Sequence, residues 1–357
     1  MPGLVGLISK KADLPVQGID HMIDALRYGH ATTVECYQEN DVAIGCIHLK
    51  TGGQKYIYQT DQAVVVFYGY LTEPNFPPGA GLSSEGSTAA HFIHDLYLAQ
   101  GEKMMSLLAG AFGFALWDIK RRLLLLASDH LGLRPIYYAE HNGVFRFASE
   151  TKGILADPSF PHHLNLESVA DFFNFAYILG EKTFFQEIQL LPPASILRYQ
   201  DGHYVIYSYW NIPIPDYYPH RSDKWYDDSI YEVIRSSVKK MVRPELMYGL
   251  SLSGGLDSRW IAAFLAEFQP DSLSFTVGTP DSDDTIIAQQ VANHMNLTHY
   301  SWNPSPGFLA EHAEVYTYLV DGMDGMNNLG EFPITLRVGD YADVSVGGFL
   351  GGENFRV

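Results

Sequence analysis

The first 211 residues show the hydrophobic pattern of an α+β domain with much antiparallel sheet. Large and small side chains alternate over residues 111–118, which is typical of a strand. Three apolar segments follow, the last two on either side of the hairpin signal Asn142-Gly143: 123–127, 136–139 and 144–147. The spacing predicts three or four consecutive strands joined by tight turns, that is, a meander.

A helix is predicted before these strands, because several hydrophobic side chains share one face of a 3.6-residue repeat. The side chains on this face are Ala89, Phe92, Ile93, Leu96 and Tyr97. Ser87 is the predicted N-cap of the helix, and Gly101 is predicted to end it.

The pattern changes after a segment rich in proline and tyrosine that begins at residue 212. Because proline at this density suits neither a helix nor a central strand, we assign residues 212–225 to a linker. Helices and strands then alternate: helix 226–241, strand 247–252, helix 258–267, strand 273–277, helix 285–295 and strand 298–301. Alternation predicts a parallel sheet within residues 226–357, with any ligand at the carboxyl ends of its strands.

One short run at such a strand end suggests the chemistry. It consists of small, flexible or hydroxylated residues between a strand and a helix: Leu252-Ser253-Gly254-Gly255-Leu256-Asp257-Ser258. In this setting successive backbone N–H groups form a concavity that faces the positive end of the helix and suits a phosphate. Asp257 adds a carboxylate that can hold Mg²⁺. The run is not a Walker A motif, because no lysine stands near the glycines.

Composition narrows the class of protein. The chain has 357 residues, 46% of them hydrophobic and 18% charged, which predicts two globular domains with little disorder. The net charge of −18 argues against a protein that binds nucleic acid non-specifically. Two cysteines without metal or disulfide spacing, and a first segment unlike a signal peptide, predict a cytoplasmic protein. No apolar run is long enough to cross a bilayer.

The motif at residues 252–258 resembles the PP-loop of the ATP pyrophosphatases, and most of the chain resembles glutamine-dependent asparagine synthetase. Relatives in that family include β-lactam synthetases and lasso-peptide cyclases. The resemblance rests on ordered matches along the chain, namely residues 108–118, 129–138 and 147–152, Leu191-Pro192-Pro193, Tyr209-Trp210 and residues 275–278.

The resemblance implies a two-domain α/β and α+β fold. Residues 1–211 would form an αββα sandwich like that of N-terminal-nucleophile (Ntn) hydrolases. Residues 226–357 would form a PP-loop ATP pyrophosphatase domain, of the adenine nucleotide α-hydrolase type. The implied reaction transfers AMP from ATP to a substrate carboxylate, releases pyrophosphate and then forms an amide or lactam. The implied cofactors are ATP and Mg²⁺.

The resemblance also assigns candidate site residues. The residues expected to bind ATP are Leu252, Ser253, Gly254, Gly255, Leu256, Asp257, Ser258, Val277, Gly347 and Gly348. Asp257 and Glu353 are the expected catalytic residues, and Asp257 is the expected Mg²⁺ ligand.

Departures from the family pattern concern glutamine hydrolysis. The family's nucleophilic cysteine follows the initiator methionine, whereas this chain has Pro2, so no glutaminase nucleophile is assigned. The family's Asn-Gly-Glu is replaced by Tyr68-Gly69-Tyr70. An arginine is missing beside residues 45–49, and an aspartate is missing from residues 85–88. We therefore expect that glutamine hydrolysis is lost and that ammonia or an amine of the substrate itself is used.

Residues 343–353 resemble the family's second nucleotide loop. Phe349 and Gly352 replace two of its acidic residues, and Glu353 remains. The chain ends at Val357, where relatives continue with a helical portion, so we expect either a fragment or a truncated protein.

The sequence leaves several hypotheses about function open. The leading one is an asparagine synthetase-like ligase, and a lasso-peptide or β-lactam-type cyclase is the first alternative. A truncated, non-catalytic homologue is the second, and a tRNA-modifying PP-loop enzyme is disfavoured by the acidic charge. The expected partner is a small-molecule or peptide carboxylate, with neither nucleic acid nor membrane, and a homodimer is an open option.

Overall fold

The computed structural model describes residues 3–10, 17–28, 32–49, 56–72, 88–214, 219–325, 329–330, 332 and 337–348. The chain divides into two units, Met1–Ile214 and Pro215–Val357. The division falls inside the segment 212–225 that the sequence assigns to a linker.

The first unit contains two six-stranded antiparallel sheets. The first sheet has the order β10 (Gln189–Leu190), β8 (Tyr137–His141), β9 (Val144–Ala148), β1 (Gly3–Ser9), β3 (Val42–Leu49) and β2 (Thr32–Glu39). The second has the order β12 (His203–Ser208), β11 (Ser195–Gln200), β7 (Leu123–Ser128), β6 (Gly110–Asp118), β5 (Ala63–Leu71) and β4 (Ile57–Gln59).

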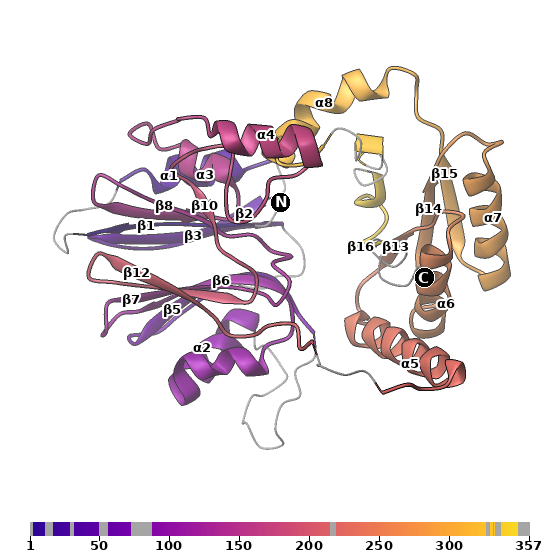
Figure 1. Cartoon of the computed structure of the whole chain (residues 1–357), viewed down its shortest axis with the longest axis horizontal. Helices are drawn as coiled ribbons and strands as arrows, with labels where there is room; N and C mark the ends of the chain where they lie inside the picture. Colours follow the sequence, from indigo (N-terminus) through magenta and orange to yellow (C-terminus); the bar gives the residue numbers. More distant parts are fainter. Residues whose placement is uncertain are drawn as a thin grey trace. The chain divides into compact units, whose positions relative to one another are not determined.

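Helices cover the outer faces of both sheets (Figure 1). The first sheet carries α1 (Ile19–Leu26) and α3 (Thr151–Leu155), with α4 (Leu166–Phe175) on the same side of the sandwich. The second sheet carries α2 (Ala89–Gln100) and the short helix η1 (Gly101–Leu107). Buried side chains of the two sheets, such as Leu4, Val64 and Leu126, form the core between them. The predicted αββα sandwich is therefore confirmed.

The predicted helix in this unit has a different cap from the expected one. Thr88 is the N-cap of α2, and its side-chain oxygen accepts a hydrogen bond from the His91 backbone N–H at 3.3 Å. Ser87, the predicted cap, lies outside the described residues. Gly101 follows the helix with a φ of 60°, which agrees with the predicted end.

The predicted meander is wrong, because its four strands are divided between the two sheets. β6 and β7 pair in the second sheet, whereas β8 and β9 pair in the first. The chain crosses from one sheet to the other after Asp129, whose side chain is fully buried. Its carboxylate accepts four backbone N–H groups at 3.0–3.1 Å, those of Phe112, Leu131, Leu133 and Arg134. These hydrogen bonds satisfy the buried backbone N–H groups around the turn that separates the β6–β7 hairpin from the β8–β9 hairpin.

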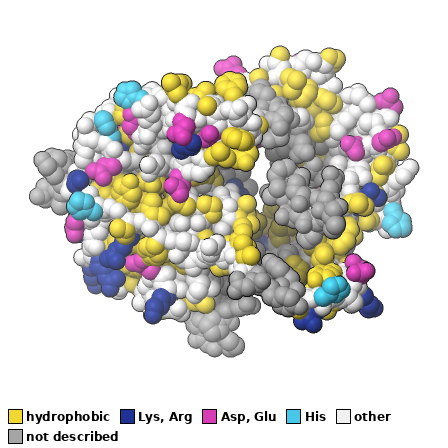
Figure 2. Space-filling model, in the orientation of Figure 1, with side chains coloured by type: hydrophobic (Ala, Val, Ile, Leu, Met, Phe, Trp, Pro, Cys, Tyr) yellow, Lys and Arg dark blue, Asp and Glu magenta, His cyan; other side chains and the backbone are white. Residues whose placement is uncertain are grey.

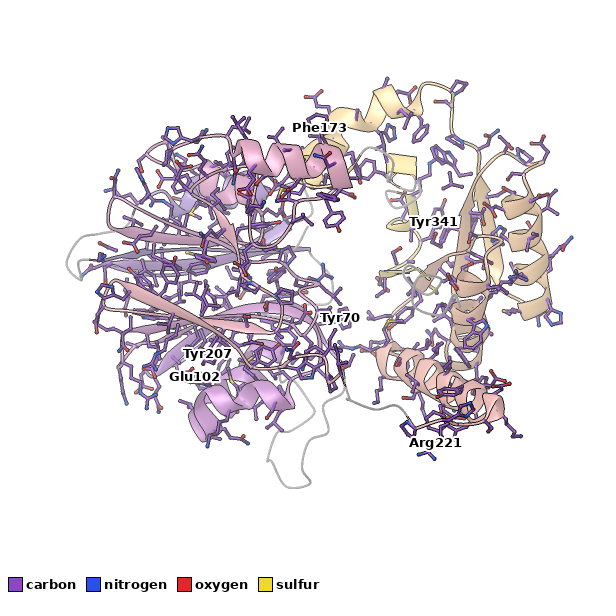
Figure 3. The ribbon with its side chains drawn as sticks, in the orientation of Figure 1. Tyr70, Glu102, Phe173, Tyr207, Arg221 and Tyr341 are labelled. Carbon is purple, nitrogen blue, oxygen red and sulfur yellow. The ribbon has the colours of Figure 1, made fainter. Side chains whose placement is uncertain are left out.

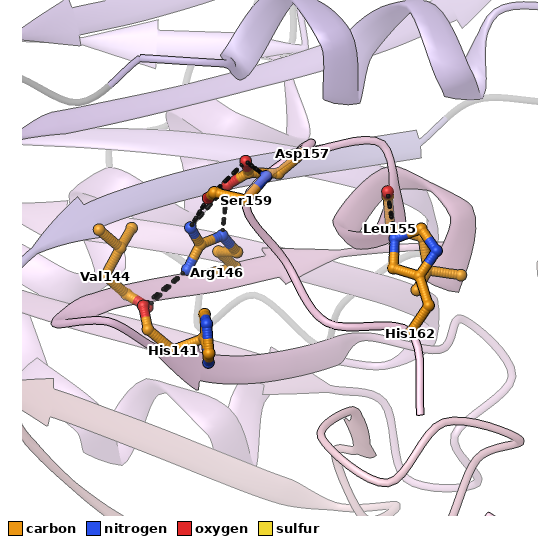
Figure 4. Close-up of polar contacts among 7 residues, drawn as sticks. All are labelled: His141, Val144, Arg146, Leu155, Asp157, Ser159 and His162. Atoms are coloured by element: carbon orange, nitrogen blue, oxygen red, sulfur yellow. Dashed lines mark hydrogen bonds and ion pairs between the residues drawn. The ribbon is translucent and has the colours of Figure 1, made fainter. Parts of the chain in front are cut away.

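A buried ion pair fixes the β8–β9 hairpin to the segment after α3 (Figure 4). Arg146 donates to one Asp157 oxygen at 2.8 and 2.6 Å, and also to the carbonyls of His141 and Val144. Burial alone would raise the pKa of Asp157, but hydrogen bonds from Ser159 and Arg146 outweigh it, so this pKa is lowered. The pair therefore stays ionised and satisfied within the unit.

The second unit contains a four-stranded parallel sheet. Its order is β15 (Thr298–Trp302), β14 (Leu273–Val277), β13 (Tyr248–Ser251) and β16 (Val344–Val346). Its helices are α5 (Asp223–Met241), α6 (Leu256–Phe268), α7 (Asp283–Met295) and α8 (Phe308–Leu319). The parallel sheet predicted from alternating strands and helices is confirmed. β16 and α8 are not among the elements that the sequence pattern predicts.

Two helices cover one face of this sheet. Ala262 and Leu265 of α6, with Ala288 and Ala292 of α7, pack in one cluster with alternate side chains of β13. On the opposite face Phe275 packs with Val338. Helix α5 begins at Asp223, within the range predicted as linker, because the Ser222 side chain caps it.

The surface in view carries charged side chains of both signs (Figure 2). On this face the described Lys and Arg side chains gather in one small group on the first unit and are otherwise scattered. Within the described ranges, no helix combines the length and the apolar character needed to span a membrane.

We predict that Asp129→Asn destabilises the first unit by about 3 kcal/mol, because an amide cannot accept all four backbone N–H groups and adds buried donors. A urea titration read by hydrogen exchange of β6 and β7 peptides measures this unit alone. Asp201→Asn, in an exposed turn with a φ of 52°, is the matched control and should leave the urea midpoint unchanged. An equal midpoint for Asp129→Asn and the wild type would contradict the assignment.

A second prediction concerns His299 of β15, whose Nδ1 lies 2.9 Å from the Ser274 Oγ while its buried Nε2 has no hydrogen-bond partner among the described residues. Burial lowers the pKa of His299 from its ordinary value of 6.5, so the unfolded chain takes up the proton first. The contribution of His299 to the free energy of unfolding is therefore complete above its ordinary pKa of 6.5, and it declines as the pH falls below this value. The melting temperature of His299→Gln should fall less between pH 7.5 and 5.5 than that of the wild type. The exposed His294→Gln should behave like the wild type, and parallel losses in all three proteins would refute this prediction.

Candidate functional site

The candidate site begins where β13 ends. Leu252 is buried, and its backbone N–H donates to the carbonyl of Phe275 at 2.8 Å. The Thr276 hydroxyl donates to the Leu252 carbonyl. Both polar groups of the Leu252 backbone are thus held by β14, which fixes the point at which the glycine-rich loop leaves the sheet.

The Ser258 hydroxyl closes this loop from within. Ser258 is 5% exposed, and its Oγ accepts the Ser253 N–H at 3.2 Å. The same Oγ lies within hydrogen-bond distance of two carbonyl oxygens, 3.1 Å from that of Ser253 and 3.2 Å from that of Gly255. The Gly255 N–H donates to the Ser253 Oγ at 3.2 Å. Ser258, predicted as a phosphate ligand, therefore has its hydroxyl engaged in holding the loop.

The closed loop leads directly into the first turn of α6. Gly255 is the N-cap, and as a glycine it has no side chain that could cap the helix. The first backbone N–H groups of an α-helix have no partner within the helix, and its N-terminus carries partial positive charge. Asp257 lies in this turn, partly exposed, and makes no hydrogen bond or ion pair with the residues that the structure describes. The turn therefore offers backbone donors and one uncommitted carboxylate.

Two other segments approach the loop closely. A Cβ at Gly348, after β16, would lie 2.8 Å from the Ser258 backbone nitrogen and 2.9 Å from the Asp257 carbonyl carbon. A Cβ at Gly254 would lie 2.9 Å from Oδ1 of Asp284, in the first turn of α7. Loop, α6, α7 and the end of β16 thus meet at the carboxyl edge of the sheet.

The other predicted residues lie at the same edge. Leu252 follows β13, Val277 ends β14, and Gly347 and Gly348 follow β16, and these three strands are neighbours. Leu256 is 67% exposed at the start of α6. Glu353 lies outside the described residues, as do Phe349 and Gly352.

Two charged side chains at this site were missed by the sequence analysis. Asp284 lies next to Gly254, although thirty residues separate them in the chain. The only local signal was the helix-start pattern Ser282-Asp283-Asp284. Arg259, one residue beyond the motif, donates from its Nε to the Gly255 carbonyl at 3.2 Å. Arg259 lies outside the glycine-rich run, whereas a P-loop would have its lysine inside such a run.

A preformed metal cage is not part of this site as far as the structure describes it. Among the described residues no three His, Cys, Asp or Glu side chains gather in an arrangement that could hold a metal. Asp257 alone suits Mg²⁺ that arrives with a nucleotide, because Mg²⁺ commonly takes one or two carboxylates together with phosphates and water.

Two of the positions at which this chain departs from the family's glutaminase pattern, Tyr68 and Tyr70, lie in the described part of the first unit. Tyr68 is 3% exposed, its ring packs over Gly113, and its hydroxyl donates to the Pro135 carbonyl. Tyr70, near the end of β5, is 39% exposed (Figure 3). Gly69 between them has a φ of 111°, and a Cβ there would lie 2.1 Å from the Ala111 carbonyl oxygen. Pro2 and residues 85–87 lie outside the described ranges.

Comparison with known proteins gives the family. A model described as a glutamine amidotransferase domain matches residues 1–210, and one described as asparagine synthase matches residues 229–337. The chain belongs to the asparagine synthetase family. The two matches correspond to the two structural units, with the sandwich in the first and the parallel sheet in the second.

Individual relatives are distant. Glutamine-hydrolysing asparagine synthetase 3 of Bacillus subtilis is 25% identical, and the match covers 98% of this chain and 63% of the relative. Asparagine synthetase B of Escherichia coli is 29% identical over 57% of this chain and 34% of the relative. The amidase chyE of Penicillium rubens is 25% identical over 72% and 41%. The chain spans less than two thirds of the length of these curated relatives.

Solved structures show only a weak likeness. Glutamine phosphoribosylpyrophosphate amidotransferase from B. subtilis, complexed with ADP and GMP, has a TM-score of 0.40 and 12% sequence identity. The match covers 86% of this chain and 82% of that chain.

We predict that Gly348→Ala loosens the first turn of α6, because the new methyl group would overlap the Ser258 backbone. Hydrogen exchange of a peptide covering residues 252–260 should become several-fold faster, since local opening becomes easier. Gly347→Ala is the matched control, because no atom of the described part of the chain lies within 4 Å of the position of its Cβ. Equal exchange rates of this peptide in the two variants would contradict the close contact between Gly348 and the backbone of Asp257 and Ser258.

Proposed function

We propose that this protein is an ATP-dependent ligase that activates a substrate carboxylate as an acyl-adenylate and joins it to an amine. The observation that carries the proposal is the loop closed by Ser258, which presents the first turn of α6 beside the uncommitted carboxylate of Asp257. Membership of the asparagine synthetase family supports this use of the loop.

In the first step a substrate carboxylate oxygen attacks the α-phosphorus of ATP. The bond between the α-phosphorus and the bridging oxygen breaks, and pyrophosphate leaves. Backbone N–H groups in the first turn of α6 stabilise the charge that develops on the leaving group, without having to reorganise. Mg²⁺, held by Asp257 and the phosphates, would neutralise part of the same charge.

The adenosine part is proposed to lie along the carboxyl edge of the sheet. Leu252, Val277 and Gly348 come from three neighbouring strands and would line this edge. Because both polar groups of the Leu252 backbone are already held by β14, hydrogen bonds to a base and a ribose are proposed for the backbones of Val277 and Gly348 only. Glu353 is proposed to act near the acyl group, as the family resemblance implies.

In the second step an amine nitrogen attacks the acyl carbon and AMP leaves, while the amine loses a proton. We propose that the amine is ammonia or belongs to the substrate, because Tyr68 fills a position where the family pattern has an asparagine. Its hydroxyl is committed to the Pro135 carbonyl and its ring to the core. A site built for glutamine would need polar groups there.

An internal amine would make the product a lactam ring, so a lactam or lasso-peptide cyclase is the second candidate. The same substitution at Tyr68 favours it, because such a reaction needs no ammonia from glutamine.

We predict that the wild type catalyses exchange of pyrophosphate into ATP in the presence of Mg²⁺ and its carboxylate substrate, to be found by screening amino acids and short peptides. Asp257→Asn should reduce this exchange by about 100-fold, because it removes the charge that holds the metal. Asp271→Asn changes an exposed carboxylate at the opposite edge of the sheet, before β14, and should have no effect.

The outcome that contradicts an active ligase is a well-folded wild type that binds no MgATP in calorimetry. Binding without exchange, for any carboxylate tried, would favour the non-catalytic homologue instead.

The proposed amine source has its own test. The purified protein should release no glutamate from glutamine above the rate without protein, whereas ammonium salts should support product formation if the amine is ammonia. Release of glutamate at a rate that matches the ligase reaction would show that the first unit is an active glutaminase.

A further inference from the structure

The second unit carries an excess of negative charge, so a cation next to the loop would favour the binding of an anionic ligand. Residues 215–357 contain twenty Asp and Glu and nine Lys and Arg. A bound nucleotide adds several negative charges of its own. Helix N-termini and one Mg²⁺ offset part of this charge, and charged donors such as Arg make the stronger hydrogen bonds to phosphate.

Arg259 is placed to supply that cation. Its Nε donates to the Gly255 carbonyl at 3.2 Å, so the guanidinium lies against the carbonyl that ends the glycine pair. Side chains on an α-helix lean toward its N-terminus, which here is the loop. The guanidinium is therefore held at the level of the first turn of α6 rather than farther along the helix.

The remaining donors of Arg259 are uncommitted. Its Nε contact is its single hydrogen bond, and it makes no ion pair with any residue that the structure describes. Two other arginines among the described residues of the second unit are engaged: Arg235 pairs with Glu267, and Arg337 lies over the Trp302 ring. The two terminal amino groups of Arg259 thus remain available as a fork for phosphate oxygens.

We propose that Arg259 binds the β- and γ-phosphates of ATP, and the pyrophosphate that they become. This inference rests on the proposed function, since it needs a nucleotide in the loop. Arg259, one residue after the motif, would supply the positive charge that P-loop proteins supply with a lysine inside their phosphate-binding loop. Because the fork is fixed through Nε, Arg259 would also orient the leaving group.

The test compares three ligands by calorimetry on the full chain: MgATP, magnesium pyrophosphate and AMP. Arg259→Met should bind MgATP and magnesium pyrophosphate about tenfold or more weakly, since it loses charged hydrogen bonds. AMP should bind within about twofold of the wild type, because it lacks these phosphates. Arg259→Lys should recover part of the loss, because it restores the charge but not the planar fork.

The matched control is Lys240→Met, which removes one exposed positive charge in the last turn of α5. The hydroxyl of Tyr248, where β13 starts, contacts the backbone of Met241 and Arg243. Lys240 therefore lies toward the amino edge of the sheet, opposite to the loop, and its loss should leave all three affinities unchanged. Equal melting temperatures of the variants exclude a loss of folding.

Two results would overturn the inference. One is an Arg259→Met variant that binds magnesium pyrophosphate as tightly as the wild type does. The other is an equal loss for AMP and pyrophosphate, which would mean that Arg259 only shapes the loop. A wild type that binds none of the three ligands would instead refute the proposed function, and the role of Arg259 with it.

Discussion

Both units depend on one constraint, that backbone polar groups must be satisfied where the chain leaves a sheet. In the first unit the buried Asp129 carboxylate meets this demand with four N–H groups and lets the chain pass from one sheet to the other. In the second unit the Ser258 hydroxyl holds the loop after β13 from inside. The consequences differ: the Asp129 carboxylate binds the backbone donors at its turn, whereas the Ser258 hydroxyl does not bind those at the start of α6, where a ligand is proposed.

Local pattern was a good guide to strands and helices but not to how strands pair. The boundaries of β14 follow from its hydrophobic run, and β6 through β9 were all expected close to where they occur. Their division between two sheets was not expected, because strand pairing is decided by contacts between residues far apart in the chain. β6, for example, pairs with β5, and the paired residues lie between 39 (Leu71 and Gly110) and 55 (Ala63 and Asp118) positions apart in the chain. The polar turn at Asp129 reads locally like any other turn.

The candidate site shows the same limit in its chemistry. Residues 252–258 could be identified because the motif is continuous and sits between a strand and a helix. Asp284 and Gly348 reach the same place from α7 and from the end of β16, so only the parallel order of the strands brings them to the loop. Arg259 is adjacent in sequence, yet its relevance depends on the bond from its Nε to the Gly255 carbonyl, which no residue pattern encodes.

The first unit shows that its fold does not depend on the polar side chains of the family's glutaminase pattern. The packing between its sheets is made by apolar side chains such as Val66, Leu126 and Phe147, and it does not need a polar residue at position 68. Tyr68 adds its ring to that packing and its hydroxyl to the Pro135 carbonyl, so its buried polar atom is satisfied. The stability of the first unit therefore does not require a glutamine-binding residue at this position, and it is independent of the loop after β13 in the second unit. The proposed loss of glutamine hydrolysis and the proposed nucleotide site are thus physically independent, which is why each is tested by its own measurement.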